Sequence, residues 1–373
     1  MSTPIVTSIA LPEYHLWKKI EGKRTLLSLE LEITARCNNS CRHCYINLPA
    51  EDPIAKNNEL KFEELKDVID EAVSLGALWC LVTGGEPLLR DDFVDIYLYL
   101  KKKGLLVSVF TNATLLGPAH IKLFKQYPPR ELEVSVYGVT KNTYERVTRT
   151  PGSYDAFRQG LDLLFANQIK IRLKAMALRS NLQEMANIAR FCRKHTKDYF
   201  RFDPLLHMRL DQNQKRNREI RSERLSPQEI VNLEQSDPER FQALKKACHE
   251  SHQTASIESI GDRLFRCGIG NGSLTLGYNG LLRLCSSLCE SDCVYDLKTG
   301  SLTDAWSNFA LKVQEQRSPA KGVLNKCRSC PLINLCQWCP AHAHLETGTM
   351  DQPIDYFCQV AHARAATLEE ATL

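Results

Sequence analysis

Three cysteines lie within eight residues in the segment TARCNNSCRHCY, residues 34–45. Cys37, Cys41 and Cys44 have the spacing C-x3-C-x2-C, and thiolates on so short a loop can bind a metal ion or an iron–sulfur cluster. A closed zinc site needs a fourth ligand, and we expect His43 to lie at the surface, because its ligation between neighbouring cysteines would be strained. Three thiolates on a [4Fe–4S] cluster leave one iron open to solvent or to a small ligand.

A second motif, Thr83-Gly84-Gly85-Glu86-Pro87, directly follows the apolar run at 77–82. Adjacent glycines allow the backbone to approach a ligand closely, because no Cβ intervenes. Glu86 adds an acid that can receive an ammonium group. The motif therefore predicts a ligand-binding loop near the cysteines, and an ordinary glycine turn beside a zinc loop is the alternative.

Nine of the fifteen cysteines lie between residues 267 and 358. They are Cys267, Cys285, Cys289, Cys293, Cys327, Cys330, Cys336, Cys339 and Cys358. In a reducing compartment such clustering indicates metal sites or catalysis rather than disulfides. The spacing C-x2-C-x5-C-x2-C over 327–339 is compatible with a zinc ribbon as well as with an iron–sulfur site.

The motifs are positioned by β-rich runs that alternate with amphipathic helical stretches from about residue 28 to 203. Strands are expected at 27–34, 77–82, 105–110, 131–136, 169–178 and 198–203. This alternation predicts βαβ units and a parallel sheet. Six units are two fewer than a full TIM barrel has, so we predict an α/β fold with a partial (β/α)6 TIM-like barrel. Loops at the carboxyl ends of such strands build active sites, and the cysteine loop has that position.

The pattern divides the chain into four segments: an N-terminal segment (1–27), the partial barrel (28–203), a bridge (204–262) and a cysteine-rich extension (263–373). The bridge includes the basic and polar run 207–224, which we expect to form a solvated face because it lacks apolar periodicity; a peptide-contacting surface is the alternative. The extension is turn-rich and too small for a strong core of its own.

Composition excludes several classes of function. The net charge of +4, from 48 basic and 44 acidic residues, is close to balance and predicts neither a nucleic-acid nor a membrane partner. The N-terminus lacks the basic start and long apolar run of a signal peptide. No stretch approaches the roughly 18 consecutive apolar residues of a membrane-spanning helix. We therefore expect a cytoplasmic protein.

The C-x3-C-x2-C motif with Tyr45 directly after it, and GGEP after the second strand, together resemble the radical S-adenosylmethionine (radical SAM) superfamily over residues 28 to about 203. The resemblance implies that Cys37, Cys41 and Cys44 hold the catalytic [4Fe–4S] cluster. The amine and carboxylate of S-adenosylmethionine would chelate the open iron, and the GGEP backbone would take the amine. The resemblance further implies cofactor contacts from Tyr45, Gly84, Gly85, Glu86, Asn112, Ser135 and Lys174.

The C-terminal cysteines are similar to the SPASM extension of radical SAM enzymes, which binds two auxiliary [4Fe–4S] clusters. The family spacing ends in C-x3-C, where this chain has C-x2-C. Carried over by position, the ligands of one auxiliary cluster would be Cys327, Cys330, Cys336 and Cys358. Those of the other would be Cys267, Cys285 and Cys339. The second set lacks a fourth ligand, which Cys289 or Cys293 could supply; otherwise the site is open and binds substrate directly.

The resemblance implies reductive cleavage of S-adenosylmethionine, after which the 5′-deoxyadenosyl radical abstracts hydrogen from a C–H bond. SPASM enzymes act mostly on peptides, so we expect a ribosomal-peptide maturase that catalyses cross-linking, oxidative decarboxylation, epimerisation or tyramine excision. Sulfatase maturases carry an aspartate where this chain has Ser286, which disfavours formylglycine formation. A tetrapyrrole or heme-precursor side-chain enzyme is the alternative within the family. A non-enzymatic zinc or iron–sulfur binding module is the alternative of another class.

The expected partners are a peptide substrate and an external electron donor of the flavodoxin or ferredoxin type. Many peptide maturases begin with a leader-binding domain, and only 26 residues precede the first expected strand here. We therefore expect either a separate leader-binding protein or a substrate that needs none.

Overall fold

The computed structural model describes residues 23–196, 200–254, 263–265, 267–318, 327, 330–333 and 335–370, with the backbone alone at 201, 247–254 and 369–370. Residues 1–22 of the expected N-terminal segment, 197–199, which include the first two residues of the strand expected at 198–203, and 255–262 of the expected bridge lie outside this description. Among the described residues, no helix is long and apolar enough to cross a membrane.

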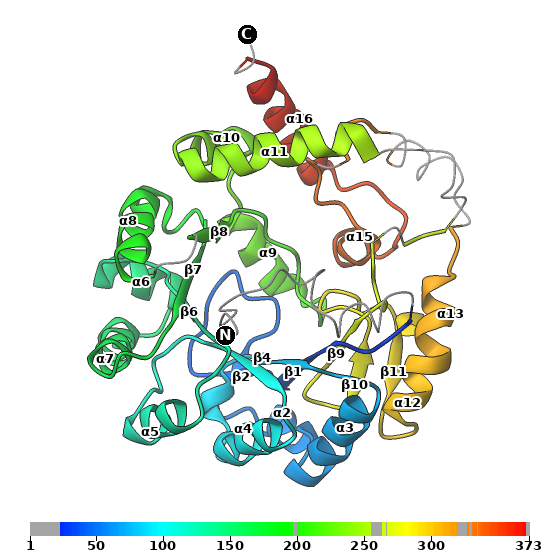
Figure 1. Ribbon diagram of the computed structural model, residues 1–373. Coiled ribbons are helices and arrows are strands. Elements are labelled where there is room, and N and C mark those ends of the chain that lie inside the picture. The colour runs from blue at the N-terminus through cyan, green and yellow to red at the C-terminus, as the bar shows by residue number, and fades with distance from the viewer. Residues whose placement is uncertain are drawn as a thin grey trace, which may run out of the picture.

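Parallel strands form the centre of the molecule, and helices lie outside them (Figure 1). Six strands are hydrogen-bonded in chain order: β1 (Ser28–Thr34), β4 (Trp79–Gly84), β5 (Leu106–Thr111), β6 (Glu131–Ser135), β7 (Arg172–Met176) and β8 (Arg201–Asp203). Two short strands, β2 (Arg36–Cys37) and β3 (Leu48–Pro49), pair with each other at the base of the cysteine loop. The predicted α/β partial barrel is confirmed.

The helices that follow these strands cover the outer face of the sheet (Figure 1). They are α2 (Pro53–Asn58), α3 (Phe62–Ser74), α4 (Phe93–Lys102), α5 (Pro118–Gln126), α6 (Lys141–Thr148), α7 (Ser153–Ala166) and α8 (Met185–His195). Helix α3 buries Leu65 and Ile69 in the same core as Leu29 and Leu31 of β1. Because side chains alternate along a strand, Glu30 and Glu32 of β1 point to the opposite face, the inside of the barrel.

The cysteine-rich extension continues the barrel sheet. Strand β9 (Ser273–Leu276) pairs in parallel with β1, and β10 (Leu281–Arg283) and β11 (Val294–Asp296) follow as antiparallel strands. Within the described chain the sheet has nine strands in the order β11-β10-β9-β1-β4-β5-β6-β7-β8. The extension thus shares its hydrophobic core with the barrel, which explains how so small a segment folds.

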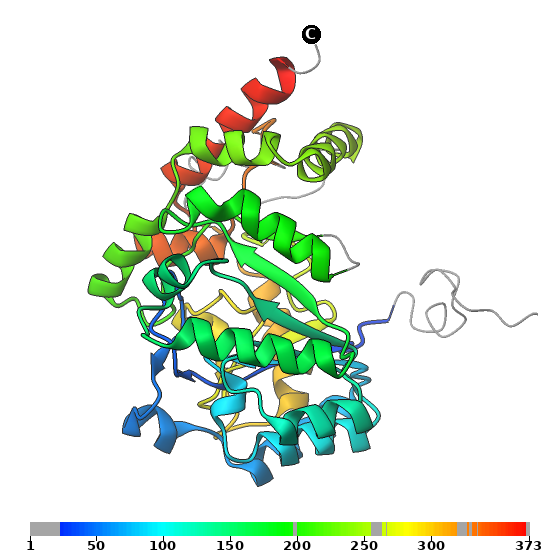
Figure 2. The ribbon, with the colours of Figure 1, turned by 90° about the vertical axis from the view of Figure 1, so that its left-hand side faces the viewer.

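The remaining helices belong to the bridge and the extension. They are α9 (Gln214–Glu223), α10 (Pro227–Gln235), α11 (Pro238–Thr254), α12 (Leu302–Asp304), α13 (Ala310–Gln314), α15 (Pro340–Thr347) and α16 (Asp355–Glu370). In Figures 1 and 2, α10, α11 and α16 lie together at one end of the molecule, far from α3 and α4. The bridge is therefore packed against the C-terminal helix.

Candidate cluster and cofactor site

The three cysteines of the first motif lie on a tight loop that leaves β1 at its carboxyl end. The thiols of Cys37 and Cys44 accept hydrogen bonds from the backbone N–H groups of Asn39 and Asn47, each at 3.4 Å. Burial raises the pKa of Cys37 and of Cys41 well above that of an ordinary thiol, and the neighbouring thiols add to this effect. Such thiols stay protonated unless a cation compensates their charge, so the loop fits an iron cluster.

The GGEP loop packs directly on the backbone that leads into the cysteine loop. The N–H of Gly85 donates to the carbonyl of Thr34 (2.7 Å), and the N–H of Glu86 donates to that of Arg36 (2.9 Å). Gly84 has a φ of +131°, and a Cβ there would lie 2.1 Å from the Thr34 oxygen. A Cβ on Gly85 would lie 2.2 Å from the Arg36 oxygen. The two glycines are therefore required by a close approach to residues 34–36.

Glu86 is fully buried and its carboxylate is occupied within the protein. It accepts hydrogen bonds from the hydroxyl of Thr111 (2.7 Å), the backbone N–H of Asn112 (2.7 Å) and the backbone N–H of Leu88 (3.2 Å). Burial raises the pKa of Glu86 to about 7, although these hydrogen bonds oppose the shift. The side chain thus ties the end of β4 to the end of β5 and shapes the loop beside Cys37.

Replacing Glu86 by glutamine should lower the free energy of unfolding by about 1–3 kcal/mol. The amide NH2 would replace an oxygen that now accepts from Thr111 or from Asn112, leaving a buried donor without an acceptor. Chemical denaturation measures the change. Glu63→Gln is the matched control, because Glu63 is largely exposed in a surface ion pair and should change stability little. Equal stability of both variants would contradict this structural role of Glu86.

Asn112 connects the end of β5 to the cysteine loop. Its Nδ2 donates to Asn38 Oδ1 (3.0 Å) and lies 3.8 Å from Cys37 Sγ. Ser135 and Lys174 are register partners on β6 and β7, on the inner wall of the barrel. The ammonium of Lys174 pairs with Glu133 and lies 3.9 Å from the Phe110 ring centroid. The structure thus brings Asn112 to the cysteines, and it engages Lys174 with the barrel wall.

The aromatic residues of the loop point inward. The Tyr45 ring lies 5.0 Å from that of His207, centroid to centroid, and burial raises the Tyr45 pKa well above its usual value. The His43 ring lies 5.1 Å from that of Tyr137. Burial lowers the pKa of His43 to about 4, and its buried Nδ1 has no hydrogen-bond partner in the structure. The expectation that His43 lies at the surface is wrong, because the loop folds its ring onto Tyr137.

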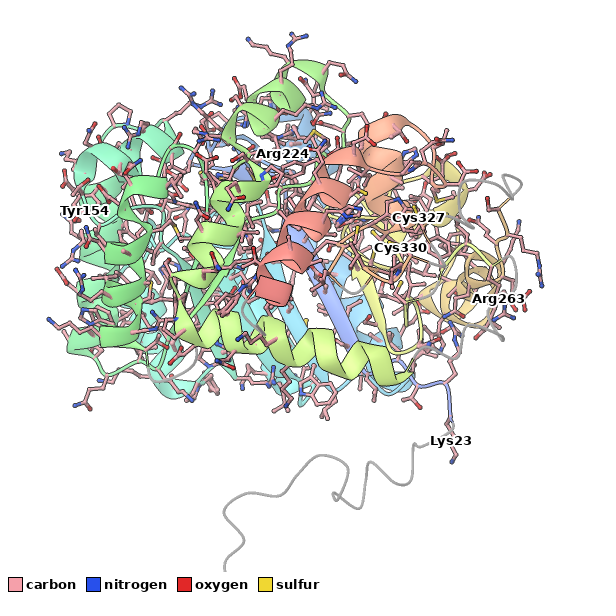
Figure 3. All side chains as sticks on the ribbon, turned by 90° about the horizontal axis from the view of Figure 1, so that it is seen from above. Lys23, Tyr154, Arg224, Arg263, Cys327 and Cys330 are labelled. Atoms are coloured by element: carbon pink, nitrogen blue, oxygen red, sulfur yellow. The ribbon has the colours of Figure 1, made fainter. Side chains whose placement is uncertain are left out.

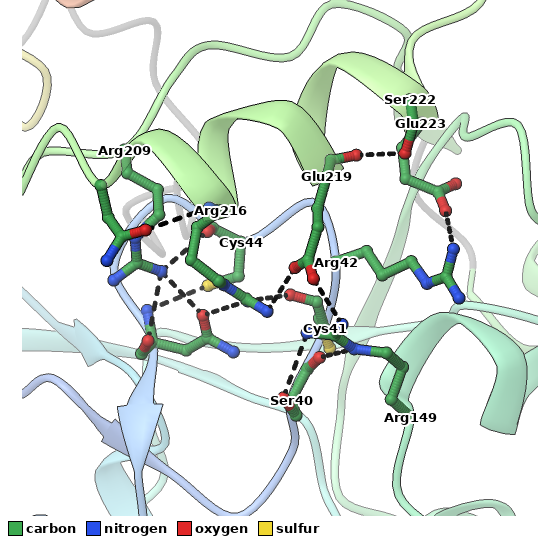
Figure 4. Close-up of polar contacts among 12 residues, drawn as sticks. Ser40, Cys41, Arg42, Cys44, Arg149, Arg209, Arg216, Glu219, Ser222 and Glu223 are labelled. Atoms are coloured by element: carbon green, nitrogen blue, oxygen red, sulfur yellow. Dashed lines mark hydrogen bonds and ion pairs between the residues drawn. The ribbon is translucent and has the colours of Figure 1, made fainter.

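Two arginines of the bridge bind the cysteine loop through its carbonyl groups (Figure 4). Arg209 is 2% exposed, and its Nη1 donates to the carbonyls of Cys44 and Asn47, both at 3.2 Å. Arg216 Nη2 donates to the Cys41 carbonyl (2.8 Å). Both guanidinium groups also donate to Asn47 Oδ1, at 3.0 and 3.1 Å. We call this pair the arginine clamp.

Charged neighbours orient the arginine clamp and add a third loop contact. Glu219 of α9 pairs with Arg216 (2.7 Å) and with Arg149 (3.0 Å), which in turn donates to the Ser40 carbonyl (2.8 Å; Figure 4). The expectation that 207–224 forms only a solvated face is therefore wrong. The run has no apolar periodicity because Arg209 and Arg216 within it bind the backbone carbonyls of the cysteine loop. A polar sequence of this kind does not show whether its side chains bind backbone groups or are exposed to solvent.

Glu32 is a further inward-facing residue that the motifs did not indicate. It is 1% exposed and pairs with Arg283 of β10, so it joins the barrel to the extension. Burial raises its pKa to about 7 against the opposing effect of Arg283. One carboxylate oxygen, Oε1, is buried without a hydrogen-bond partner. The segment LSLELEIT does carry a signal for it, because acids alternate with apolar residues in a strand of a barrel.

The stability of the chain should fall as pH rises from about 4.5 to about 7. Burial raises the pKa of both Glu32 and Glu86 from 4.5 to about 7. Between these values the folded chain holds protons that the unfolded chain has released, so the free energy of unfolding decreases with increasing pH. Denaturation curves across this window measure the slope, which should be shallower in the Glu86→Gln variant. A free energy of unfolding that rises steadily through the window would contradict the assignment.

The C-terminal cysteines fall into two groups. The pKa of Cys336 is raised by burial and by the nearby thiols of Cys358, Cys327 and Cys330. Figure 3 shows Cys327 and Cys330 near each other, and the N–H of Cys330 donates to the Cys327 carbonyl (3.3 Å). In the second group, burial and the nearby thiols of Cys285 and Cys267 raise the pKa of Cys339 to about 12.

Cys289 and Cys293 have different surroundings, although both lie within electrostatic range of Cys285. Cys293 is fully buried in the main core, and its thiol donates to Gln316 Oε1 (3.4 Å). Cys289 is half-buried and lines a cavity that also includes Arg283. The placement leaves both cysteines near the second group.

The fold and the loop geometry together define a class of protein. Residues 31–192 match the family model of the Radical SAM superfamily, so the chain contains a radical SAM domain. The resemblance to the radical SAM superfamily that the cysteine and GGEP motifs predict is confirmed over these residues.

The chain is similar in sequence to proteins that are named for different products, a heme and a bacteriocin. The chain is 31% identical over 154 residues to the AdoMet-dependent heme synthase of Methanosarcina barkeri (strain Fusaro / DSM 804), over 41% of this chain and 43% of that protein. It is 27% identical over 164 residues to the Antilisterial bacteriocin subtilosin biosynthesis protein AlbA of Bacillus subtilis (strain 168), over 44% of this chain and 36% of that protein. The matches thus span less than half the length of these curated relatives.

Similarity to solved structures extends over most of the chain. Streptococcus suis SuiB bound to S-adenosylmethionine superposes with a TM-score of 0.66 at 15% identity, covering 92% of this chain and 80% of SuiB. SuiB bound to the precursor peptide SuiA gives a TM-score of 0.65 at 14% identity, over 92% of this chain and 79% of that one. At such low identity the similarity shows the fold, which includes the region of the extension.

Proposed function

We propose that the chain is a radical SAM enzyme that modifies a peptide substrate. The observation that carries the proposal is the group of three thiols at the carboxyl end of β1, of which that of Cys41 is buried and those of Cys37 and Cys44 are half-buried. Cys37, Cys41 and Cys44 lie on a loop that the GGEP segment and the arginine clamp hold from two sides. Three thiolates can bind the cationic iron–sulfur core of such a cluster, and the loop carries no fourth thiol.

The residues around the loop have distinct tasks in this proposal. The three thiolates would hold a [4Fe–4S] cluster, and the backbone carbonyls of the GGEP loop would accept from the amine of S-adenosylmethionine. Asn112 orients the loop through Asn38. Ser135 and Lys174, neighbours in the register of β6 and β7, would contact the cofactor from the barrel wall. When bound, the cluster and S-adenosylmethionine supply the 5′-deoxyadenosyl radical that removes hydrogen from the substrate. The barrel positions the C–H bond and excludes water.

The extension would hold two auxiliary clusters. We assign Cys327, Cys330, Cys336 and Cys358 to one of them. Cys267, Cys285 and Cys339 are assigned to the other. Cys289 and Cys293 are both candidates for its fourth ligand, because each lies near Cys285. An external electron donor of the flavodoxin or ferredoxin type would reduce the first cluster.

Two substrate classes are consistent with the relatives, and we favour a peptide. The similarity to SuiB extends over the barrel and the extension, whereas the match to the heme synthase covers 41% of this chain. The relative AlbA is named for bacteriocin biosynthesis. A separate leader-binding protein remains part of the proposal. A tetrapyrrole side-chain enzyme is the second candidate, supported by the name of the heme synthase.

Anaerobic reconstitution tests the proposal. We expect about twelve irons and as many sulfides per chain, four for each of three cubane clusters. With a strong reductant the protein should then release 5′-deoxyadenosine from S-adenosylmethionine. Zinc as the only bound metal, without cofactor cleavage, would support the non-enzymatic binding module instead. Mass spectrometry of candidate precursor peptides after turnover separates the peptide class from the tetrapyrrole class.

A further inference from the structure

A cavity of about 270 Å³ with a mainly apolar lining lies beside the first cysteine loop, between the barrel and the extension. Tyr45 and Ile46, which directly follow Cys44, form one wall. The extension forms the opposite wall with Tyr278, Leu281 and Val294. Pockets for drug-sized ligands have volumes of roughly 300–1,000 Å³. This cavity is slightly smaller than that range, so it can hold one large side chain. A group bound here would lie next to the loop that carries the first cluster.

The cavity contains one unsatisfied polar atom. Glu32 lines it, is 1% exposed, and has its Oε1 buried without a hydrogen-bond partner, while its Oε2 pairs with Arg283. The Tyr45 hydroxyl lies close enough to lower the pKa of Glu32, but Oε1 has no hydrogen-bond partner in the structure. Buried polar atoms are almost always paired in folded proteins, so Oε1 is free to accept from a ligand. At a pH above about 7 Glu32 is ionised, and its Oε1 is then a strong hydrogen-bond acceptor.

The charges in the wall select against an ionic ligand. Arg283 is already paired with Glu32, and Arg209, which also lines the cavity, is paired with Asp211 (2.6 Å). A lysine side chain would therefore be placed beside two guanidinium groups. A carboxylate would be placed beside Glu32 and Asp211 without a free cation among the described lining residues. A neutral donor on an apolar body matches the wall, which also contains Ala35, Leu48 and Leu210.

We propose that this cavity binds an aromatic side chain of the peptide substrate that carries a hydrogen-bond donor, a tyrosine phenol or a tryptophan indole, with the donor directed at Glu32 Oε1. The inference rests on the proposed peptide-modifying function and specifies which residue of the peptide the enzyme selects. Aromatic rings have the size and apolar surface that Tyr45, Tyr278 and the aliphatic wall can cover. Their O–H or N–H group supplies the donor that Glu32 lacks.

Equilibrium dialysis of the full chain, reconstituted anaerobically with S-adenosylmethionine, tests this with N-acetyl amides of single amino acids. At about pH 8, where Glu32 is ionised, the tyrosine and tryptophan amides should bind at least about tenfold more tightly than the phenylalanine amide, because only their side chains donate to a charged acceptor. The double variant Glu32→Leu/Arg283→Met replaces the buried pair by apolar groups and should abolish this preference. Leu281→Trp should fill the cavity and abolish binding, whereas Leu281→Met should retain it.

Several results would overturn the proposal. Equal binding of the phenylalanine and tyrosine amides to the unmodified protein would show that Glu32 Oε1 accepts nothing from the ligand. Tighter binding of the lysine or glutamate amide would show that the cavity selects charge. Absence of binding by every amide, in a protein that still releases 5′-deoxyadenosine, would refute the cavity assignment and leave the radical chemistry intact. Loss of 5′-deoxyadenosine release in the unmodified protein would instead refute the proposed function.

Discussion

Replacing Cys37, Cys41 and Cys44 together by alanine should abolish the release of 5′-deoxyadenosine and leave about eight of about twelve irons bound. The three thiols share one loop, and the only carboxylate of the GGEP segment, that of Glu86, is already engaged by Thr111 and Asn112. The cysteines assigned to the auxiliary clusters lie in the extension, which obtains its core from the barrel sheet. Iron and sulfide analysis, together with chromatography of the nucleoside product, measures both effects.

The matched control for this triple variant removes cysteines that belong to neither cluster region. Cys80 and Cys192 are 1% and 0% exposed in the hydrophobic core. The double variant Cys80→Ala/Cys192→Ala should keep all irons and cleave S-adenosylmethionine as the unmodified protein does. Wild-type cleavage by the triple variant would refute the assignment of the first cluster. Loss of all irons from the triple variant would refute the independence of the extension.

The elements of the barrel could be predicted because their signal is local. Each strand is a short apolar run, and each following helix has apolar residues at helical spacing, so six units could be counted from the sequence. The ends were less accurate: the run expected at 77–82 is β4 at Trp79–Gly84, and the run expected at 169–178 is β7 at Arg172–Met176. Periodicity identifies the buried face, whereas strand ends depend on hydrogen bonds to neighbouring strands.

The contacts between distant segments could not be predicted from one sequence. Strand β9 pairs with β1 although about 240 residues separate them in the chain, and no local pattern encodes that register. The partners of Glu86 could not be predicted either. The sequence suggested an ammonium group as its partner, whereas the carboxylate accepts hydrogen bonds from Thr111 and Asn112. A motif shows which side chains are present in a loop. The groups that those side chains bind depend on which other loops the fold brings close to them.

No sequence pattern indicated the arginine clamp. Its loss should strongly destabilise the cysteine loop. Arg209→Lys should lower the stability of the cysteine loop by about 3 kcal/mol. Arg209 donates to two carbonyls and to Asn47 Oδ1 through Nη1, while its Nε and Nη2 bind Asp211. A lysine ammonium is a single compact donor group and cannot reproduce this planar arrangement.

Hydrogen exchange of the loop amides measures this effect directly, because local opening sets the exchange rate. The amides of residues 37–47 should exchange about a hundredfold faster in Arg209→Lys, the factor that corresponds to about 3 kcal/mol. The reconstituted variant should also lose iron from the first cluster sooner. Arg218→Lys is the matched control, because Arg218 lies on the same segment of bridge but is exposed. Equal loop protection in both variants would show that the buried guanidinium of Arg209 does not stabilise the loop, and Arg216 and Arg149 would then have to account for its conformation.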